Sequence, residues 1–117
     1  MSRSAIERLQ DIVASADLAA RHAGDLDAAA LAATPGSRDA TLYRLAVVCE
    51  ASSQLPAELK ALAPEIPWPQ IRATRNYIVH GYWQIDFRII VDTLSHDLGP
   101  LQAAANRLLG MLQADRQ

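Results

Sequence analysis

The sequence predicts an all-α protein, arranged as an up-and-down bundle of four main helices with one short additional helix. Apolar residues recur along the segments at steps of three and four, the period of a helix that packs on one side. No segment alternates apolar and polar residues as a half-buried strand does. Half of the 117 residues are apolar, which is enough for one core and too few for two, so we expect a single domain over residues 1–117.

The first helix should begin at Ser4 and run to about His22. Glu7 follows Ser4 at the spacing of a capping box, in which each side chain binds the backbone N–H of the other residue. The apolar stripe of this helix comprises Ile6, Leu9, Val13, Ala16 and Ala20. Residues 23–35 are rich in alanine but are bounded by Gly24 and by Thr34-Pro35-Gly36, so we expect a loop there.

The second helix should begin at Ser37 or Asp39. Its buried stripe is expected to comprise Leu42, Leu45, Ala46, Cys49 and Ser53. Because Cys49 belongs to this stripe, we expect its thiol to be packed and unreactive.

A short helix is expected over residues 57–63, with Leu59 and Leu62 facing inward. Prolines at 64, 67 and 69 then stiffen the approach to the third main helix. That helix should begin at Trp68-Pro69, because proline lacks only an N–H that the first helical turn does not use.

The last helical region should be capped by Asp86 and should keep one apolar register to its end. We expect Gly99-Pro100 to kink or break the helix locally while both halves face the same core. The stripe comprises Phe87, Val91, Leu94, Leu98, Leu101, Ala105, Leu108 and Leu112.

Composition excludes several classes of protein. A net charge of −2 argues against non-specific coating of nucleic acid, and the single cysteine leaves no internal disulfide framework. One cysteine and three scattered histidines offer no zinc-ligand spacing, so we expect neither a metal nor a cofactor. No signal peptide or membrane-spanning apolar run is visible, and we expect a cytoplasmic protein without a membrane partner.

The candidate functional residues lie at the end of the third main helix. Arg75, Asn76, His80 and Tyr82 bring a fixed cation, an amide, an imidazole and a phenol into eight residues. Gly81 should end the helix by adopting a positive φ. His80 would then be the last helical residue, where the negative end of the helix dipole favours its protonated form.

The spacing of these residues indicates an incomplete site. Asn76 and His80 lie one above the other on the helix, whereas Arg75 and His80 diverge by roughly 140° around the axis. Arg75 and His80 can therefore meet only because arginine is long and His80 stands at the open helix end. A second helix or a second subunit would have to form the other wall.

These residues resemble the signature of the HepT-like branch of the HEPN superfamily. The resemblance is carried by Arg75-(four residues)-His80-x-Tyr82, by Ile66-Pro67-Trp68 before it and by Ile85-Asp86 after it. Val48-Cys49-Glu50-Ala51 is similar to a family segment that usually has glycine at the position of Cys49. The resemblance extends roughly from Leu9 to Leu109 and agrees with the predicted order of helices.

The resemblance implies a HEPN-like helical fold and a metal-independent endoribonuclease toxin. Such a toxin acts as a homodimer on an RNA substrate and is paired with a minimal nucleotidyltransferase antitoxin. Tyr82 matches the family tyrosine that accepts adenylyl groups from that partner. A tyrosine that only packs and hydrogen-bonds at the helix end is the alternative for Tyr82.

Metal-free RNA cleavage uses the neighbouring 2′-hydroxyl as nucleophile, which requires a base, an acid and a cation. We assign His80 as base and acid, Arg75 as the phosphate clamp, and Asn76 as a group that orients the imidazole or the phosphate. Two copies of the chain would supply two His80 and two Arg75 side chains to one cleft.

Other functions remain open at this stage. Arg75 could instead pair with Asp86 or Glu50 while His80 only caps the helix. Two non-catalytic functions are also open: a helical module that binds a nucleotidyltransferase, and a plain dimeric scaffold.

Overall fold

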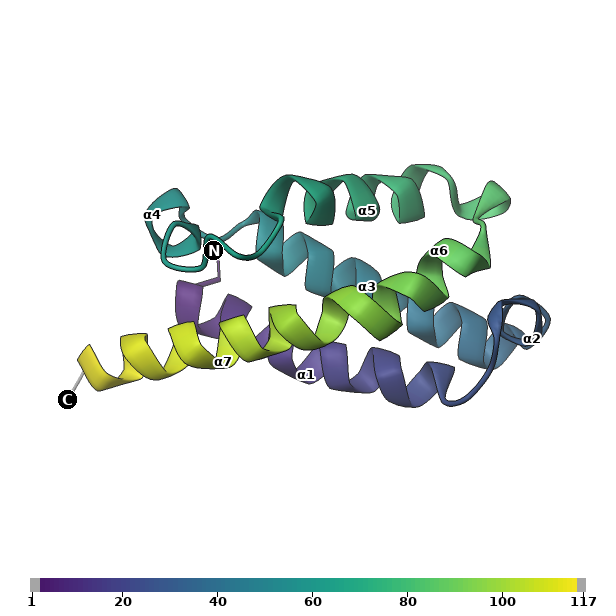
Figure 1. Ribbon diagram of the computed structural model, residues 1–117, viewed down its shortest axis with the longest axis horizontal. Helices are drawn as coiled ribbons and strands as arrows, with labels where there is room; N and C mark the ends of the chain where they lie inside the picture. Colours follow the sequence, from purple (N-terminus) through teal and green to yellow (C-terminus); the bar gives the residue numbers. More distant parts are fainter. Residues whose placement is uncertain (1–2, 116–117) are drawn as a thin grey trace.

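Four long helical segments run antiparallel to their neighbours in sequence (Figure 1). The computed structural model describes residues 3–115; residues 1–2 and 116–117, the two ends of the expected 1–117 domain, lie outside it. Across residues 3–115 all regular structure is helical, as the sequence predicts. The elements are α1 (Ala5–Ala23), α2 (Ala28–Ala32), α3 (Pro35–Ser53), α4 (Ala57–Lys60), α5 (Trp68–His80), the 3₁₀ turn η1 (Tyr82–Gln84), α6 (Phe87–Asp92), the π-helical turn η2 (Thr93–Asp97) and α7 (Leu98–Asp115).

The core lies where α1, α3 and the α6–α7 segment meet. α1 packs along both α3 and α7, and α5 packs on the remaining side of α3 (Figure 1). The largest fully buried apolar side chains are Leu9, Ile12, Leu31, Leu45, Ile90, Leu108 and Val48. Within α5, whose residues the structure describes in full, only Ile78 is buried. The helix with the predicted site therefore leaves most of its surface open.

Local signals at the starts of α1 and α6 are confirmed. Ser4 and Glu7 form the predicted capping box, with each side chain bound to the backbone N–H of the other residue. The side chain of Asp86 accepts from the N–H of Arg88 at the start of α6. These caps satisfy N–H groups that have no partner within the helix.

Two predictions about the segment before α3 are wrong. Residues 23–35 are not only a loop, because the Asp27 side chain caps α2 by accepting from the N–H of Ala30 at 2.8 Å, and Leu31 is buried in the core. α3 begins at Pro35 rather than at Ser37 or Asp39, since proline is well suited to the first helical position.

The buried face of α3 is wider than predicted. Leu42, Leu45 and Cys49 are buried, whereas Ala46 and Ser53 are half-buried. α3 packs on α1 on one side and on α5 on the other, so a single stripe could not cover both contacts. The additional buried residues are Thr41, Val48, Ala51 and Ser52.

The short helix also ends earlier than expected. α4 stops at Lys60, so Leu62 lies outside the helix and is 50% exposed, whereas Leu59 is buried as predicted.

The final register is confirmed, but the chain does not break at Gly99-Pro100. α7 begins at Leu98 and continues through that pair. The irregularity lies just before it, in η2, where the N–H of Leu98 binds the carbonyl of Thr93 five residues back. A π turn absorbs the displacement that proline imposes on the preceding helical turn.

Every helix between residues 3 and 115 is too short or too polar to cross a membrane.

Candidate active site

Both ends of α5 are fixed to the rest of the fold. At its start, the indole N–H of Trp68 donates to the carbonyls of Lys60 and Ala63, each at 3.1 Å. Near its end, the hydroxyl of Tyr77 accepts from the N–H of Asp86 at 2.7 Å and joins α5 to the start of α6. His80 is the last residue of the helix, as predicted.

Gly81 ends α5 for a different reason from the predicted one. Its φ is −106°, so no left-handed conformation is required. A Cβ at this position would instead lie 2.7 Å from the carbonyl oxygen of Tyr77, the oxygen that accepts the N–H of Gly81 at 2.9 Å. Glycine is needed here because the chain turns tightly against its own helix.

Arg75 is held by a carboxylate of the neighbouring helix. Its Nε donates to Oε2 of Glu50 on α3 at 2.9 Å, and its Nη1 donates to Oδ1 of Asn76 at 3.1 Å. Of the two acids considered from the sequence, Glu50 is therefore the partner, while Asp86 pairs with Arg88 at 2.8 Å. The Arg75 and Glu50 side chains remain 32% and 47% exposed. Their contact fixes the direction of the guanidinium without removing it from solvent.

Two hollows open on either side of Arg75. One, of about 330 Å³, is also bordered by Arg3, Arg8 and Tyr43. The other, of about 240 Å³, is also bordered by Arg72 and Asn76. Arg75 and Glu50 border both. A guanidinium held in this position can donate to a phosphate oxygen that enters from either side.

His80 and Asn76 occupy different positions relative to Arg75. His80 is exposed at the end of α5 and, within residues 3–115, is not among the residues that border either hollow. Asn76 is exposed, and its side-chain oxygen accepts a hydrogen bond from Arg75. One copy of the chain thus joins Arg75 to Asn76 and leaves the imidazole facing solvent.

Tyr82 is anchored to the start of α3. Its hydroxyl donates to Oδ1 of Asp39 at 2.9 Å, and the same oxygen accepts from Nε of Arg38 at 2.9 Å. The hydrogen bond to Asp39 raises the pKa of Tyr82. The pKa of Asp39 is lowered, first by the bond from Arg38 and then by that from Tyr82. The phenol is therefore protonated at neutral pH and donates its hydrogen bond to an ionised carboxylate.

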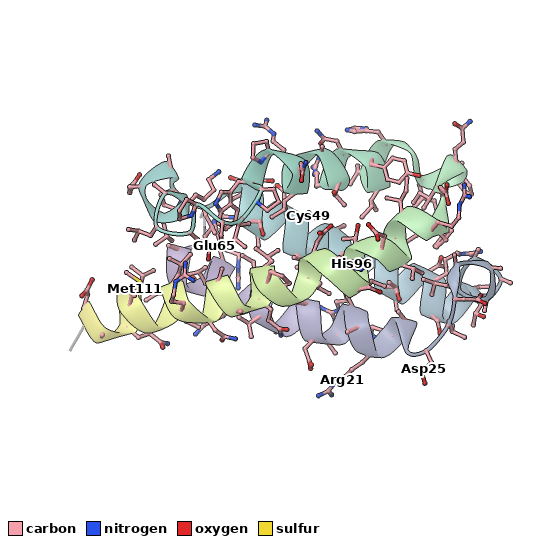
Figure 2. The ribbon with its side chains drawn as sticks, in the orientation of Figure 1. Arg21, Asp25, Cys49, Glu65, His96 and Met111 are labelled. Carbon is pink, nitrogen blue, oxygen red and sulfur yellow. The ribbon has the colours of Figure 1, made fainter. Side chains whose placement is uncertain are left out.

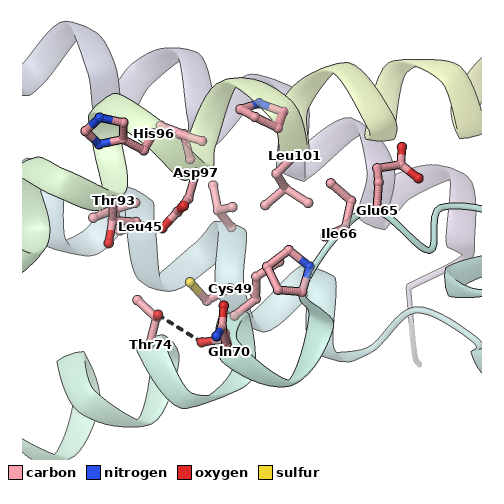
Figure 3. A pocket seen from close by; sticks show the side chains of 15 residues that line it. Leu45, Cys49, Glu65, Ile66, Gln70, Thr74, Thr93, His96, Asp97 and Leu101 are labelled. Atoms are coloured by element: carbon pink, nitrogen blue, oxygen red, sulfur yellow. Dashed lines mark hydrogen bonds between the residues drawn. The ribbon is translucent and has the colours of Figure 1, made fainter.

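A third cavity contains none of the predicted site residues. It has a volume of about 240 Å³ and lies between α5 and the η2–α7 segment, over α3 (Figure 2). Figure 3 shows His96 and Asp97 on one side and Gln70 and Thr74 on the other, with Cys49 between them. Cys49 is 4% exposed, so the thiol is packed as predicted, and burial raises its pKa to about 12, which keeps it protonated at neutral pH. Within residues 3–115, no cluster of three His, Cys, Asp or Glu side chains could hold a metal ion.

Two acidic residues on α3 hold the site. The sequence offered Glu50 as one of two possible partners of Arg75, and this contact is confirmed, whereas the contact of Asp39 with Tyr82 was missed because Asp39 was considered only as a possible helix start. Both act across long sequence separations, 25 residues to Arg75 and 43 residues to Tyr82. Their positions on α3 supply no local signal, because an exposed acid on a helix is usually solvated.

The antiparallel helix packing is that of a HEPN-like bundle, and the family comparison places the chain in the HEPN superfamily. Within it, the chain belongs to the HepT-like ribonuclease family, because the family model "Ribonuclease HepT-like" matches residues 3–108.

Curated relatives agree with this family. "Probable ribonuclease HepT" of Thermococcus cleftensis is 27% identical over 108 residues, which cover 92% of this chain and 98% of that protein. Two proteins of Methanocaldococcus jannaschii named "Putative RNase" are 26% and 20% identical, over 77% and 90% of this chain and 83% and 90% of their own lengths. No solved structure matches the chain significantly.

Proposed function

We propose that this protein is a metal-independent endoribonuclease toxin of a type VII-like toxin–antitoxin system. Membership of a ribonuclease family supports the reaction. The position of Arg75 is the main structural support for this site. Glu50 holds Arg75 where it borders two hollows, and His80 is exposed on the same helix.

In this proposal Arg75 binds the scissile phosphate and His80 moves the protons. The 2′-hydroxyl loses its proton to a neutral imidazole, and its oxygen attacks phosphorus. The bond to the 5′-oxygen then breaks, and an imidazolium supplies the proton to that leaving oxygen. The guanidinium stabilises the extra negative charge on the phosphoryl oxygens in the transition state. Of the two roles considered for Asn76, its hydrogen bond to Arg75 favours orienting the scissile phosphate, through the guanidinium, over orienting the imidazole.

The reaction needs a base and an acid, and each copy of the chain brings one His80. We therefore propose a homodimer in which two α5 ends meet across a two-fold axis. The open surface of α5, with only Ile78 buried among its described residues, is compatible with such a contact. A symmetric dimer is the commonest closed assembly.

A minimal nucleotidyltransferase is the proposed antitoxin, and Tyr82 its target. The Tyr82 oxygen would attack the α-phosphorus of a nucleoside triphosphate, pyrophosphate would leave, and Asp39 would accept the phenolic proton. The bound nucleotide would then place a phosphodiester charge and a bulky group beside the RNA site.

The reaction is tested with purified protein and a labelled single-stranded RNA. Wild type should cleave it, also in the presence of a chelator, whereas His80→Ala and Arg75→Ala should lose cleavage. The matched control is His22→Ala, because His22 is also an exposed histidine in the last turn of its helix. Cleavage that survives His80→Ala, or that stops when chelator is added, would refute the mechanism.

The toxin system is tested by expression in cells. The chain alone should arrest growth, His80→Ala should not, and co-expression with the nucleotidyltransferase encoded beside it should restore growth. Mass spectrometry of the co-expressed protein should show adenylylated Tyr82. If the chain bound the nucleotidyltransferase but neither arrested growth nor cleaved RNA, it would instead be the non-catalytic binding module.

A further inference from the structure

Trp83 is the most exposed large apolar side chain among the described residues. Its side chain is 93% exposed, and it lies in η1, three residues after His80. Three consecutive backbone steps limit the distance between the Cα atoms of His80 and Trp83 to about 11 Å. The indole is thus close to the proposed proton-transfer group.

The turn that bears Trp83 is tied to the fold on both sides. The N–H of Gln84 binds the carbonyl of Gly81 at 2.8 Å, and the N–H of Asp86 binds the hydroxyl of Tyr77 at 2.7 Å. The Tyr82 hydroxyl anchors the turn to Asp39 on α3. The indole therefore projects from a held backbone rather than from an unrestrained loop.

The contact with the neighbouring Tyr82 leaves most of the Trp83 indole exposed to solvent. The rings of Tyr82 and Trp83 meet edge to face, with centroids 5.5 Å apart and an angle of 84° between their planes. The exposed fraction of Trp83 shows that this contact covers little of its ring. The indole also borders a hollow of about 200 Å³, whose other lining residues are Arg38, Tyr82 and the apolar Ala32, Leu42, Ile85 and Phe87.

We propose that Trp83 stacks on a base of single-stranded RNA next to the scissile phosphate and thereby sets where the RNA lies. This inference rests on the proposed ribonuclease function. Attack by a 2′-hydroxyl requires a flexible linkage, and RNA in single strands presents unstacked bases that aromatic side chains bind. Arg75 and His80 would act on the phosphate and the protons, while Trp83 would determine which linkage they reach.

The surroundings of Trp83 favour RNA over a protein partner. Protein hot spots bury an aromatic ring within an apolar patch. The exposed residues that flank Trp83 on the chain are Tyr82, whose hydroxyl is hydrogen-bonded, and the polar Gln84. The acids near Trp83 in the fold, Asp39 and Asp86, are paired with Arg38 and Arg88. This pairing lowers the electrostatic repulsion between these carboxylates and an RNA phosphate chain.

Binding is tested with a short oligonucleotide of 2′-O-methyl ribose, in which the attacking hydroxyl is blocked. The chain has two tryptophans, and Trp68 is half-buried with its indole N–H engaged. Saturating oligonucleotide should quench the wild-type indole emission. Trp83→Phe, in which only Trp68 emits, should show no such quenching.

Affinity separates stacking from general hydrophobic contact. Trp83→Ala and Trp83→Leu should both weaken binding by between about 5-fold and 150-fold, whereas Trp83→Phe should lose less because it keeps an aromatic face. In the cleavage assay the same variants should raise KM more than they lower kcat. Leu62→Ala, which alters another exposed apolar side chain, is the control and should bind as wild type does.

The outcomes distinguish this inference from the function on which it rests. His80-dependent cleavage with an unchanged KM in Trp83→Ala, or emission that RNA does not alter, would refute stacking and leave the ribonuclease intact. Loss of dimerisation or of nucleotidyltransferase binding in Trp83→Ala, with RNA affinity unchanged, would show a protein contact and overturn the inference. A wild-type protein that neither binds nor cleaves RNA would refute both.

Discussion

Arg75 and Glu50 join α5 to α3 through a contact of 2.9 Å between Nε and Oε2. The contact uses one edge of the guanidinium, and Nη1 binds Asn76 on the same helix. Because the pair is partly exposed, its contribution to folding stability is at most about 1 kcal/mol. Its main consequence is to fix where Arg75 points.

Glu50→Ala should therefore impair cleavage more than stability. Without its acceptor the guanidinium samples other rotamers, and misplacement of a catalytic group by an ångström can cost about 100-fold in rate. Glu50→Gln keeps an oxygen acceptor and should retain most of kcat. Single-turnover cleavage and denaturant unfolding measure the two effects.

The matched control for this prediction is Glu65→Ala. Glu65 and Arg107 also form an exposed pair at 2.9 Å, with side chains 49% and 48% exposed, but Arg107 belongs to α7. Its loss should leave cleavage unchanged. Equal effects of Glu50→Ala and Glu65→Ala on the rate would show that Glu50 does not position Arg75.

Gly81→Ala should destabilise the protein although its φ is accessible to alanine. The added Cβ would meet the carbonyl oxygen of Tyr77 at 2.7 Å, so the turn after His80 must shift. We expect a loss of about 1–3 kcal/mol in the free energy of unfolding, measured in urea. Gly110→Ala has open space around the new methyl group in α7 and should stabilise by roughly 0.5–1 kcal/mol. A stable Gly81→Ala would mean that the turn is not held against α5.

The sequence predicted the features that depend on neighbours in the chain. The capping box at Ser4, the start of α5 at Trp68, its end at His80 and the cap at Asp86 follow from short-range rules, and all are confirmed. The prediction of a positive φ at Gly81 was wrong, since close approach to Tyr77 rather than handedness requires glycine.

Features that depend on packing could not be read from the sequence. α2 forms because Leu31 is buried in the core. The sequence around Leu31 does not indicate that the side chain reaches the core. The contacts of Arg75 with Glu50 and of Tyr82 with Asp39 depend on how α5 lies on α3. The four motif residues were identified from their spacing, and their roles remain predictions.

Cys49 provides a probe of how tightly α5 covers α3. A buried thiol with a pKa of about 12 has almost no thiolate at neutral pH, so a thiol reagent should label it slowly in the native protein and rapidly in denaturant. The labelling rate under native conditions should rise in proportion to the population of opened molecules. Gly81→Ala should accelerate it, and Gly110→Ala should not. Rapid labelling of the native wild type would show that the cavity beside Cys49 is open to reagents.

The contact between Tyr82 and Asp39 should be visible in an alkaline titration. The carboxylate accepts the phenolic hydrogen bond and raises the pKa of Tyr82 above its ordinary value of about 10. Asp39→Asn removes the negative charge, so ionisation of Tyr82 should begin at lower pH, as followed by the ultraviolet absorbance of tyrosinate. Tyr82→Phe should remove the same component of the curve, which identifies it.

The sign of the linked stability effect follows from the direction of this shift. A folded-state pKa above the unfolded one gives stability that is present below about pH 10 and is lost as the pH rises through the folded value. Wild type should therefore lose stability at high pH more steeply than Asp39→Asn. Asp92→Asn is the control, because Asp92 pairs with His96 on the α6–η2 segment and does not contact Tyr82. If Asp39→Asn and Asp92→Asn gave the same titration, Asp39 would not hold the phenol, and its proposed role as proton acceptor in the modification of Tyr82 would fail with it.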